Sequence, residues 1–227
     1  MMKCVRFAFL AVLAATALRA EALSDILARM DQSARDLHTF SAKMKRTEYT
    51  KVLNDKEETD GLRLVKRANG QTIGIVQIFG KNPQIIRFAG KTVEIYYPDA
   101  KRVEVYDAGK FGKMGKQADQ LMLIGIGVTS ADLRRDFEIK GGAPEKIGET
   151  NTTRIDLIPK DNDLKKYVEK IEMWVPDKQS VPLQVKVTRT SGDYEQAVYS
   201  DIKFNPSLPD SAFQLNLPPD VKRVQMK

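Results

Sequence analysis

The sequence predicts an α+β fold. We expect a strongly curved antiparallel sheet of about ten or eleven strands, an incomplete barrel whose concave face is covered by an N-terminal helix and short helices. Three features predict it: one amphipathic helical segment near the start, a long succession of segments with a two-residue hydrophobic period, and short polar turns between them. With 227 residues, 42% hydrophobic and 30% charged, the chain can bury a large core, so one domain is the default.

Residues 1–22 have the pattern of a secretory signal peptide. Two basic residues precede an apolar run, Phe7–Leu18, and the triplet Ala20-Glu21-Ala22 has the small-x-small form of a cleavage site. The run has 12 residues, which is too short for a permanent membrane anchor. Cys4 precedes this run, so it cannot be the acylated cysteine of a lipoprotein. We therefore expect secretion and a single domain over residues 23–227.

The amphipathic segment predicts a helix from about Ser24 to Leu37, with Ser24 as its cap and Asp25 as an acid in its first turn. Its apolar stripe needs a surface to cover. Packing on the sheet explains the stripe better than membrane insertion, because the stripe is narrow and acids occupy the polar face. The stripe comprises Leu23, Ile26, Leu27, Met30, Ala34 and Leu37.

After His38 the hydrophobic period changes to two, and gaps of three to six residues leave no room for the helices of a parallel sheet. Two short helices are expected at Ala118–Ile124 and Ala131–Phe137, the second capped by Thr129-Ser130. Strands are expected at Phe40–Met44, Leu62–Arg67, Thr72–Phe79, Ile85–Ala89, Val93–Tyr97, Val103–Tyr106, Phe137–Lys140, Thr153–Ile158, Val168–Val175, Leu183–Thr190, Glu195–Phe204 and, at the end, Phe213–Leu217.

The chain lacks the residues of the common catalytic sites. One cysteine and one histidine cannot form a zinc site or a nucleophilic triad. The glycines of Gly109–Gly115 do not have the spacing of a phosphate-binding loop, and carboxylate pairs such as Asp161 and Asp163 fall in polar turns. We expect no enzymatic activity, metal or cofactor. The net charge of +7 is interleaved with acids, which argues against nucleic acid as a partner and leaves attraction to anionic lipid open.

A half-closed barrel can be filled by its own side chains or can leave a hydrophobic pocket for an acyl chain. The composition does not choose between these. A shift of one residue would turn a strand's side chains to the other face. From the two-residue and helical periods, the expected inward-facing, lipid-binding residues are Leu27, Met30, Phe40, Ala42, Met44, Val65, Ile75, Ile95, Leu123, Ile124, Leu157 and Val185.

Four segments, in their order and spacing, resemble signatures of the LolA-type periplasmic lipoprotein carriers. The resemblance implies an incomplete barrel closed by a helical lid, acylated lipoproteins as cargo, and a location in the periplasm. It also implies an inner-membrane transporter and an outer-membrane receptor as partners, and a monomer. The absence of an acylatable cysteine favours the soluble carrier over the receptor. The segments are Gly61–Asn69, Gly90-Lys91-Thr92 through Tyr96-Tyr97-Pro98, Leu121–Ile124 and Phe213–Val221.

The resemblance assigns one polar residue individually. Arg67 matches the arginine of the family's Lys-Arg-Pro-Asn turn, which projects under the lid and hydrogen-bonds it shut; an exposed turn arginine is the alternative. Ala68 replaces the usual proline and Glu94 stands where the family often has tryptophan, which predicts a reshaped turn and neighbouring pocket. A carrier of another lipid, such as a glycolipid or a hopanoid-like molecule, and a sensor of mislocalised lipoproteins remain alternative functions.

Overall fold

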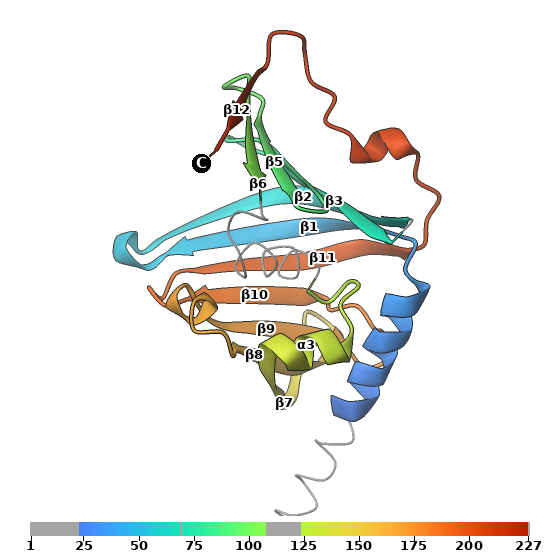
Figure 1. Ribbon diagram of the computed structural model, residues 1–227. Helices are drawn as coiled ribbons and strands as arrows, with labels where there is room; N and C mark the ends of the chain where they lie inside the picture. The colour runs from blue at the N-terminus through green and yellow to red at the C-terminus, as the bar shows by residue number, and fades with distance from the viewer. Residues whose placement is uncertain (1–22, 69, 108–123, 227) are drawn as a thin grey trace, which may run out of the picture.

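The computed structural model describes residues 23–68, 70–107 and 124–226. Its strands form one curved 12-stranded sheet in the order β12-β6-β5-β4-β3-β2-β1-β11-β10-β9-β8-β7 (Figure 1). Neighbouring strands are antiparallel except β12 and β6, which pair in parallel. The strands are β1 (Thr39–Thr50), β2 (Asp55–Ala68), β3 (Gln71–Ile78), β4 (Gln84–Ala89), β5 (Thr92–Tyr97), β6 (Arg102–Asp107), β7 (Phe137–Ile147), β8 (Thr150–Pro159), β9 (Val168–Pro176), β10 (Gln184–Arg189), β11 (Tyr194–Phe204) and β12 (Lys222–Gln225).

The predicted N-terminal helix is present at residues 23–36 and lies against the concave face of the sheet (Figure 1). Its apolar stripe is buried: Ile26, Leu27 and Met30 are 2–3% exposed. The side chain of Asn205, which follows β11, holds the connection between the N-terminal helix and β1 in place. Its amide donates to the carbonyl oxygen of Asp36, and its oxygen accepts the backbone N–H groups of residues 38 and 39.

The second helix, α3 (Ser130–Asp136), agrees with the helix expected at Ala131–Phe137. Thr129 is its N-cap, because the threonine hydroxyl oxygen accepts a hydrogen bond from the backbone N–H of Asp132. The Thr129 hydroxyl in turn donates to the Asp132 carboxylate, and this hydrogen bond lowers the pKa of Asp132. The other short helix, expected at Ala118–Ile124, lies outside the described residues apart from Ile124.

Buried apolar side chains form two clusters on the concave face and one on the convex face. The first inner cluster joins the N-terminal helix and α3 to β7–β9, and the second inner cluster joins Leu37 and Ile126 to β1–β4 and β11. The outer cluster consists of Leu64, Ile75 and Phe213, with partly buried neighbours. The helices therefore cover the concave face, as the sequence predicts.

Several of the expected strands differ in the structure. β1 continues past the expected Met44 to Thr50, and β7 continues past the expected Lys140 to Ile147. β2 begins at Asp55, well before the expected Leu62, because it pairs along the whole length of β1 into a long hairpin. Asp55–Glu58, at the start of β2, are polar and exposed, so no hydrophobic alternation marks this part of the strand. The expected strand Phe213–Leu217 is wrong: a 3-10 helix, η3 (Asp210–Phe213), and irregular chain occupy this region.

The twelfth strand, β12, was not expected. Its four residues are all exposed and lie at the edge of the sheet, where neither face needs apolar side chains. The Lys101 ammonium and the Asp220 carboxylate, 2.5 Å apart, help to hold the chain beside β6. Within the described residues, no helix is long and apolar enough to cross a membrane.

The segment between β11 and β12 crosses the convex side of the sheet as a strap (Figure 1). Phe213 anchors it: the ring is 3% exposed and packs against Leu64 and Ile75. Two polar contacts assist, one from Arg87 Nε to the carbonyl oxygen of Phe213 at 2.8 Å and one between Lys66 and Asp210. This strap covers the apolar residues of the convex face that the helices do not reach.

Replacing Phe213 by alanine is expected to lower the free energy of unfolding by about 3 kcal/mol, the low end for a buried aromatic, because an irregular strap can partly close over the cavity. Chemical denaturation measures this change. Phe79, which is 47% exposed, provides the matched control, and its replacement by alanine should change the free energy by less than about 0.5 kcal/mol. Equal effects of the two substitutions would mean that the strap does not depend on its anchor.

Candidate functional site: the lid and the concave face

Arg67 joins the sheet to the N-terminal helix and to the segment before α3. It lies near the end of β2, and its half-buried guanidinium donates from Nη1 to the carbonyl oxygen of Ala34 at 2.5 Å and from Nη2 to that of Gly127 at 2.7 Å. Ala34 belongs to the last turn of the N-terminal helix, where carbonyl groups lack partners within the helix and the helix dipole favours a positive charge. The contact to helix-end carbonyls is the geometry that the resemblance implies for this arginine.

Gly127 is required at its position by close packing. A Cβ atom there would lie 2.7 Å from Cδ2 of Leu37 and 3.0 Å from Nη2 of Arg67. Because the contact with the buried Leu37 is shorter than Cβ atoms make, a larger residue would have to displace Leu37, whereas glycine lets the backbone approach the guanidinium without this shift. The segment before α3 is thus shaped to accept the hydrogen bond from Arg67.

The N-terminal helix and α3 are also hydrogen-bonded to each other. The carboxylate of Asp31, on the N-terminal helix, accepts the backbone N–H of Ser130 at 2.5 Å and the Ser130 hydroxyl at 2.7 Å. Ser130 is the first residue of α3. The N-terminal helix, residues 124–128 and α3 are therefore connected by polar contacts, and we call these three segments the lid.

Most of the expected inward-facing residues come together beneath the lid. Ile95 also faces inward, since it pairs with Ile86, but it is only half-buried and belongs to neither inner cluster. Leu123 lies outside the described residues. The first inner cluster contains Leu27, Met30, Ile124 and Leu157, the second contains Phe40, Ala42, Met44 and Val65, and Val185 packs against both.

Ile75 is wrong as an inward-facing residue. It pairs with Leu64 in the β2–β3 ladder, and both side chains belong to the outer cluster beneath Phe213. Val65 and Val76 face inward instead. The segment Gln71–Ile78 is apolar on both faces because the strap buries the convex one, so a two-residue period could not show which face was which.

Glu94 is likewise not part of an inner pocket. Its side chain is 7% exposed on the convex face. There it accepts a hydrogen bond from Arg87 at 2.8 Å and forms an ion pair with Arg223 of β12. The expectation that Glu94 reshapes the neighbouring pocket is therefore wrong. On the convex face this residue helps to hold β12 at the edge of the sheet.

The concave face is filled where the lid covers it. Phe40, Val65 and Leu157 have no exposed surface, and Met30 and Ile124 of the lid are 2% exposed. In the described part of the molecule these side chains pack on one another, so the filled alternative describes this closed state. Room for an acyl chain between them requires the lid to move.

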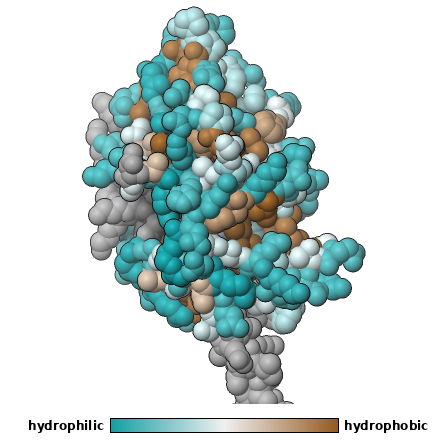
Figure 2. All heavy atoms as spheres, turned by 90° about the vertical axis from the view of Figure 1, so that its right-hand side faces the viewer, coloured by the Kyte–Doolittle hydropathy of each residue, from teal (hydrophilic) through white to brown (hydrophobic). Residues whose placement is uncertain are grey.

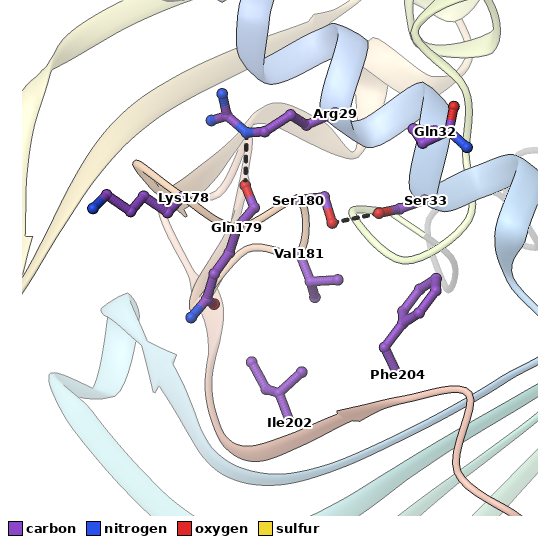
Figure 3. Close-up of a pocket in the computed structure, with 9 residues that line it drawn as sticks. All are labelled: Arg29, Gln32, Ser33, Lys178, Gln179, Ser180, Val181, Ile202 and Phe204. Atoms are coloured by element: carbon purple, nitrogen blue, oxygen red, sulfur yellow. Dashed lines mark hydrogen bonds between the residues drawn. The ribbon is translucent and has the colours of Figure 1, made fainter.

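A cavity of about 480 Å³ opens at one edge of the lid (Figure 3). Arg29 Nε donates to the carbonyl oxygen of Gln179 across it at 3.2 Å, and the hydroxyl groups of Ser33 and Ser180 form a second hydrogen bond. These contacts connect the helix to the β9–β10 loop. The cavity is lined by Arg29, Gln32 and Ser33 of the helix, by Lys178, Gln179, Ser180 and Val181 of the loop, and by Ile202 and Phe204 of β11.

The apolar side of this cavity is continuous with the core. Val181 belongs to the second inner cluster, and Ile202 packs against that cluster. Figure 2, which faces the side of the molecule where the N-terminal helix lies, shows apolar surface near the middle, surrounded by hydrophilic side chains. The cavity therefore borders the second inner cluster at the edge of the lid, where two hydrogen bonds hold the helix to the β9–β10 loop.

The far end of the concave face, on β5 and β6, is polar. Glu104 is 8% exposed; its carboxylate accepts hydrogen bonds from Tyr106 at 2.8 Å and Tyr97 at 3.3 Å and pairs with Arg102 at 2.7 Å. The hydrogen bond to Glu104 and the burial of the ring raise the pKa of Tyr106 to about 12. The buried charge of Glu104 is thus fully compensated.

Sequence reasoning missed Arg63, which is 7% exposed on the concave face. Its Nη1 donates to the hydroxyl of Tyr199, and its guanidinium carbon lies 5.6 Å from the centre of the Tyr199 ring. The alternation Arg63, Val65, Arg67 places all three side chains on one face, and this was the available signal. Among the described residues, no cluster of side chains could hold a metal ion.

Comparison with solved structures supports the fold. An uncharacterized conserved protein from Thermus thermophilus matches with a TM-score of 0.55 and 10% identity, covering 90% of this chain and 99% of that one. MucB matches with a TM-score of 0.53 and 11% identity over 87% of this chain; the chain spans 63% of the length of MucB. A LolA superfamily protein from Nitrosomonas europaea matches with a TM-score of 0.42 and 14% identity, covering 85% of this chain and 97% of that one.

The sequence matches no protein-family model and no curated protein. At these identities the structural matches show the fold alone. The predicted fold class is confirmed: the described residues form an incomplete antiparallel barrel, a single curved sheet with helices over its concave face.

Proposed function

We propose that this protein is an extracytoplasmic carrier that takes up acyl chains beneath its lid. The observation that carries the proposal is Arg67, which holds two separate lid segments over an apolar concave face by hydrogen bonds to Ala34 and Gly127. Such a latch can be opened without disturbing the sheet. The LolA-like fold and the signal-peptide pattern of residues 1–22 also support it.

The energies are compatible with reversible loading. Burying an acyl chain contributes about 0.8 kcal/mol per methylene group, so a palmitoyl chain supplies on the order of 10 kcal/mol. Opening the lid breaks the two charge-assisted hydrogen bonds of Arg67, each worth roughly 1.5–3 kcal/mol, which costs less free energy than burial of the chain supplies. An acyl chain can therefore displace the lid and still be bound, while part of the binding energy is used to open the latch.

The full proposal is a periplasmic carrier that receives acylated lipoproteins from an inner-membrane transporter and delivers them to an outer-membrane receptor. It acts as a monomer and has no catalytic role. The edge cavity beside Ser33 and Ser180 is the opening through which the acyl chain enters.

Native mass spectrometry of the protein purified from its native host tests this function. We expect added masses that correspond to acylated lipoproteins, or to another acyl lipid if the cargo differs. In a second measurement, palmitate should displace an environment-sensitive dye at micromolar concentration. No added mass together with no displacement would contradict the carrier function.

A sensor function is the second candidate, because MucB shares the fold and has been solved in complex with MucA. A sensor of lipoproteins would bind acyl chains too, but it would then change its affinity for a protein partner and would not pass the lipid on. Transfer of a labelled lipid from the protein to acceptor vesicles or a receptor separates the two functions. A sensor should retain the lipid under conditions in which a carrier releases it.

A further inference from the structure

Arg63 differs from every other buried charged residue in the described part of the chain. Glu94 pairs with two arginines, Glu104 with Arg102, and Glu172 with Lys170 at 2.9 Å. No carboxylate forms an ion pair with Arg63 among the described residues.

The guanidinium of Arg63 is also short of hydrogen-bond partners. Nη1 donates to the Tyr199 hydroxyl, but the N–H groups of Nε and Nη2 are buried and make no hydrogen bond to any residue that the structure describes. A guanidinium stays charged in proteins and carries five donors. A buried guanidinium whose charge has no counter-ion and whose Nε and Nη2 have no hydrogen-bond acceptor is energetically unfavourable. A bound anion would supply both the opposite charge and the acceptors.

The surroundings of Arg63 specify what that group is attached to. In the β-ladders Arg63 lies opposite Ala42 on one side and Val76 on the other, and both belong to the second inner cluster together with Tyr199. The unpaired donors thus sit within an apolar region. A small anion would lose its hydration in this apolar region and gain few contacts in return. An anion joined to an apolar chain would accept hydrogen bonds from Arg63 and also bury its chain among the apolar side chains.

We propose that Arg63 binds the terminal oxyanion, carboxylate or phosphate, of an anionic amphiphile whose acyl chain lies among the side chains of the second inner cluster. Tyr199 positions the guanidinium through its hydroxyl and ring. This inference rests on the proposed uptake of acyl chains beneath the lid, and it replaces acylated lipoproteins as the cargo. The ester- and amide-linked acyl chains of a lipoprotein have no charged end, whereas a fatty acid or a phosphate-bearing lipid has one, so Arg63 favours the latter two.

Binding of matched probes to the full protein tests the assignment. Palmitate and hexadecyl phosphate carry the oxyanion, hexadecanol has a chain of similar size without it, and acetate and inorganic phosphate are the anions alone. We expect at least one anionic amphiphile to bind about 10- to 100-fold more tightly than hexadecanol. The better of the two anionic probes identifies the head group, and the free anions should bind far more weakly than either.

The variant Arg63→Met keeps the apolar length of the side chain and removes the charge. We expect the preference for the anionic amphiphile to fall to about 1-fold while the affinity for hexadecanol changes by less than about 2-fold. Without ligand, the melting temperature of this variant should be unchanged or higher, because an unpaired buried charge is gone. Should Arg63→Met fail to fold, Arg63→Gln serves as the second variant with the same expected loss.

The control is Lys81→Met, which removes an exposed positive charge in the turn between β3 and β4, outside the lid, and it should leave all affinities unchanged. The assignment is overturned if palmitate, hexadecyl phosphate and hexadecanol bind equally, if Arg63→Met keeps the preference, or if a free anion binds as tightly as its amphiphile. Hexadecanol binding without any such preference leaves the carrier function standing. If none of the amphiphiles binds, both proposals fail.

Discussion

Replacing Arg67 by leucine is expected to loosen the lid while the sheet stays folded. The substitution removes the hydrogen bonds to Ala34 and Gly127, each worth roughly 1.5–3 kcal/mol, and leaves one helix-end carbonyl group and one turn carbonyl group without this partner. Because the closed state becomes less favourable, lipid uptake should strengthen by about 10-fold or more. Hand-off to an acceptor should slow, since closing of the lid no longer helps to expel the lipid.

Hydrogen exchange of residues 23–36 measures how far the lid is loosened, and dye displacement by palmitate measures lipid uptake. Transfer of a labelled lipid to acceptor vesicles measures hand-off. Arg67→Lys should fall between the native protein and Arg67→Leu, because an ammonium group cannot reach two carbonyls in the same fork geometry. Lys81→Leu, an exposed substitution in the turn between β3 and β4 and outside the lid, controls for the loss of a positive charge. Global unfolding of Arg67→Leu, or unchanged affinity and transfer, would show that Arg67 is not a latch.

Replacing Gly74 by alanine should lower the free energy of unfolding by about 4 kcal/mol, above the usual cost of adding one methyl group to a core. A Cβ atom at residue 74 would lie 1.7 Å from Cζ of Phe88 and 2.3 Å from both Cε atoms. Phe88 is 2% exposed in the second inner cluster, so its ring cannot move aside without displacing other core residues. Chemical denaturation measures the loss.

A double-mutant cycle isolates the clash from other causes. Phe88→Ala alone should cost about 3–5 kcal/mol through the cavity that it creates. Adding Gly74→Ala to Phe88→Ala should then cost less than about 1 kcal/mol, because the new methyl group no longer meets the ring. An additive result would place the effect of Gly74→Ala in the backbone and not in the contact with Phe88.

Much of the architecture could be predicted because it depends on local pattern. The stripe of Ile26, Leu27 and Met30 marks a helix wherever its apolar face packs, and Thr129 marks the start of α3 through a cap that reaches only three residues. Short turns excluded a parallel sheet without any knowledge of long-range contacts. The inward residues were correct on strands such as β1, where one face alone is apolar.

The candidate site was predicted less completely. Arg67 was found through a resemblance of motifs, not through its contacts, since its two acceptors are backbone carbonyls 33 and 60 residues away in the chain. A backbone carbonyl leaves no mark on the sequence. Arg63 was missed because a charged residue within a strand normally faces solvent, and only the lid and neighbouring strands decide that this one is buried.

The amino-acid sequence by itself determined the N-terminal helix and the antiparallel succession of strands, because these follow from spacing and composition. Only the tertiary structure decided which face of each strand is inside. The strap at Phe213 buries the convex side of β2 and β3, so Ile75 and Leu64 are as apolar as the inward residues beside them. Burial on both faces removes the alternation from the sequence, and the distinction then depends on contacts with segments more than a hundred residues away.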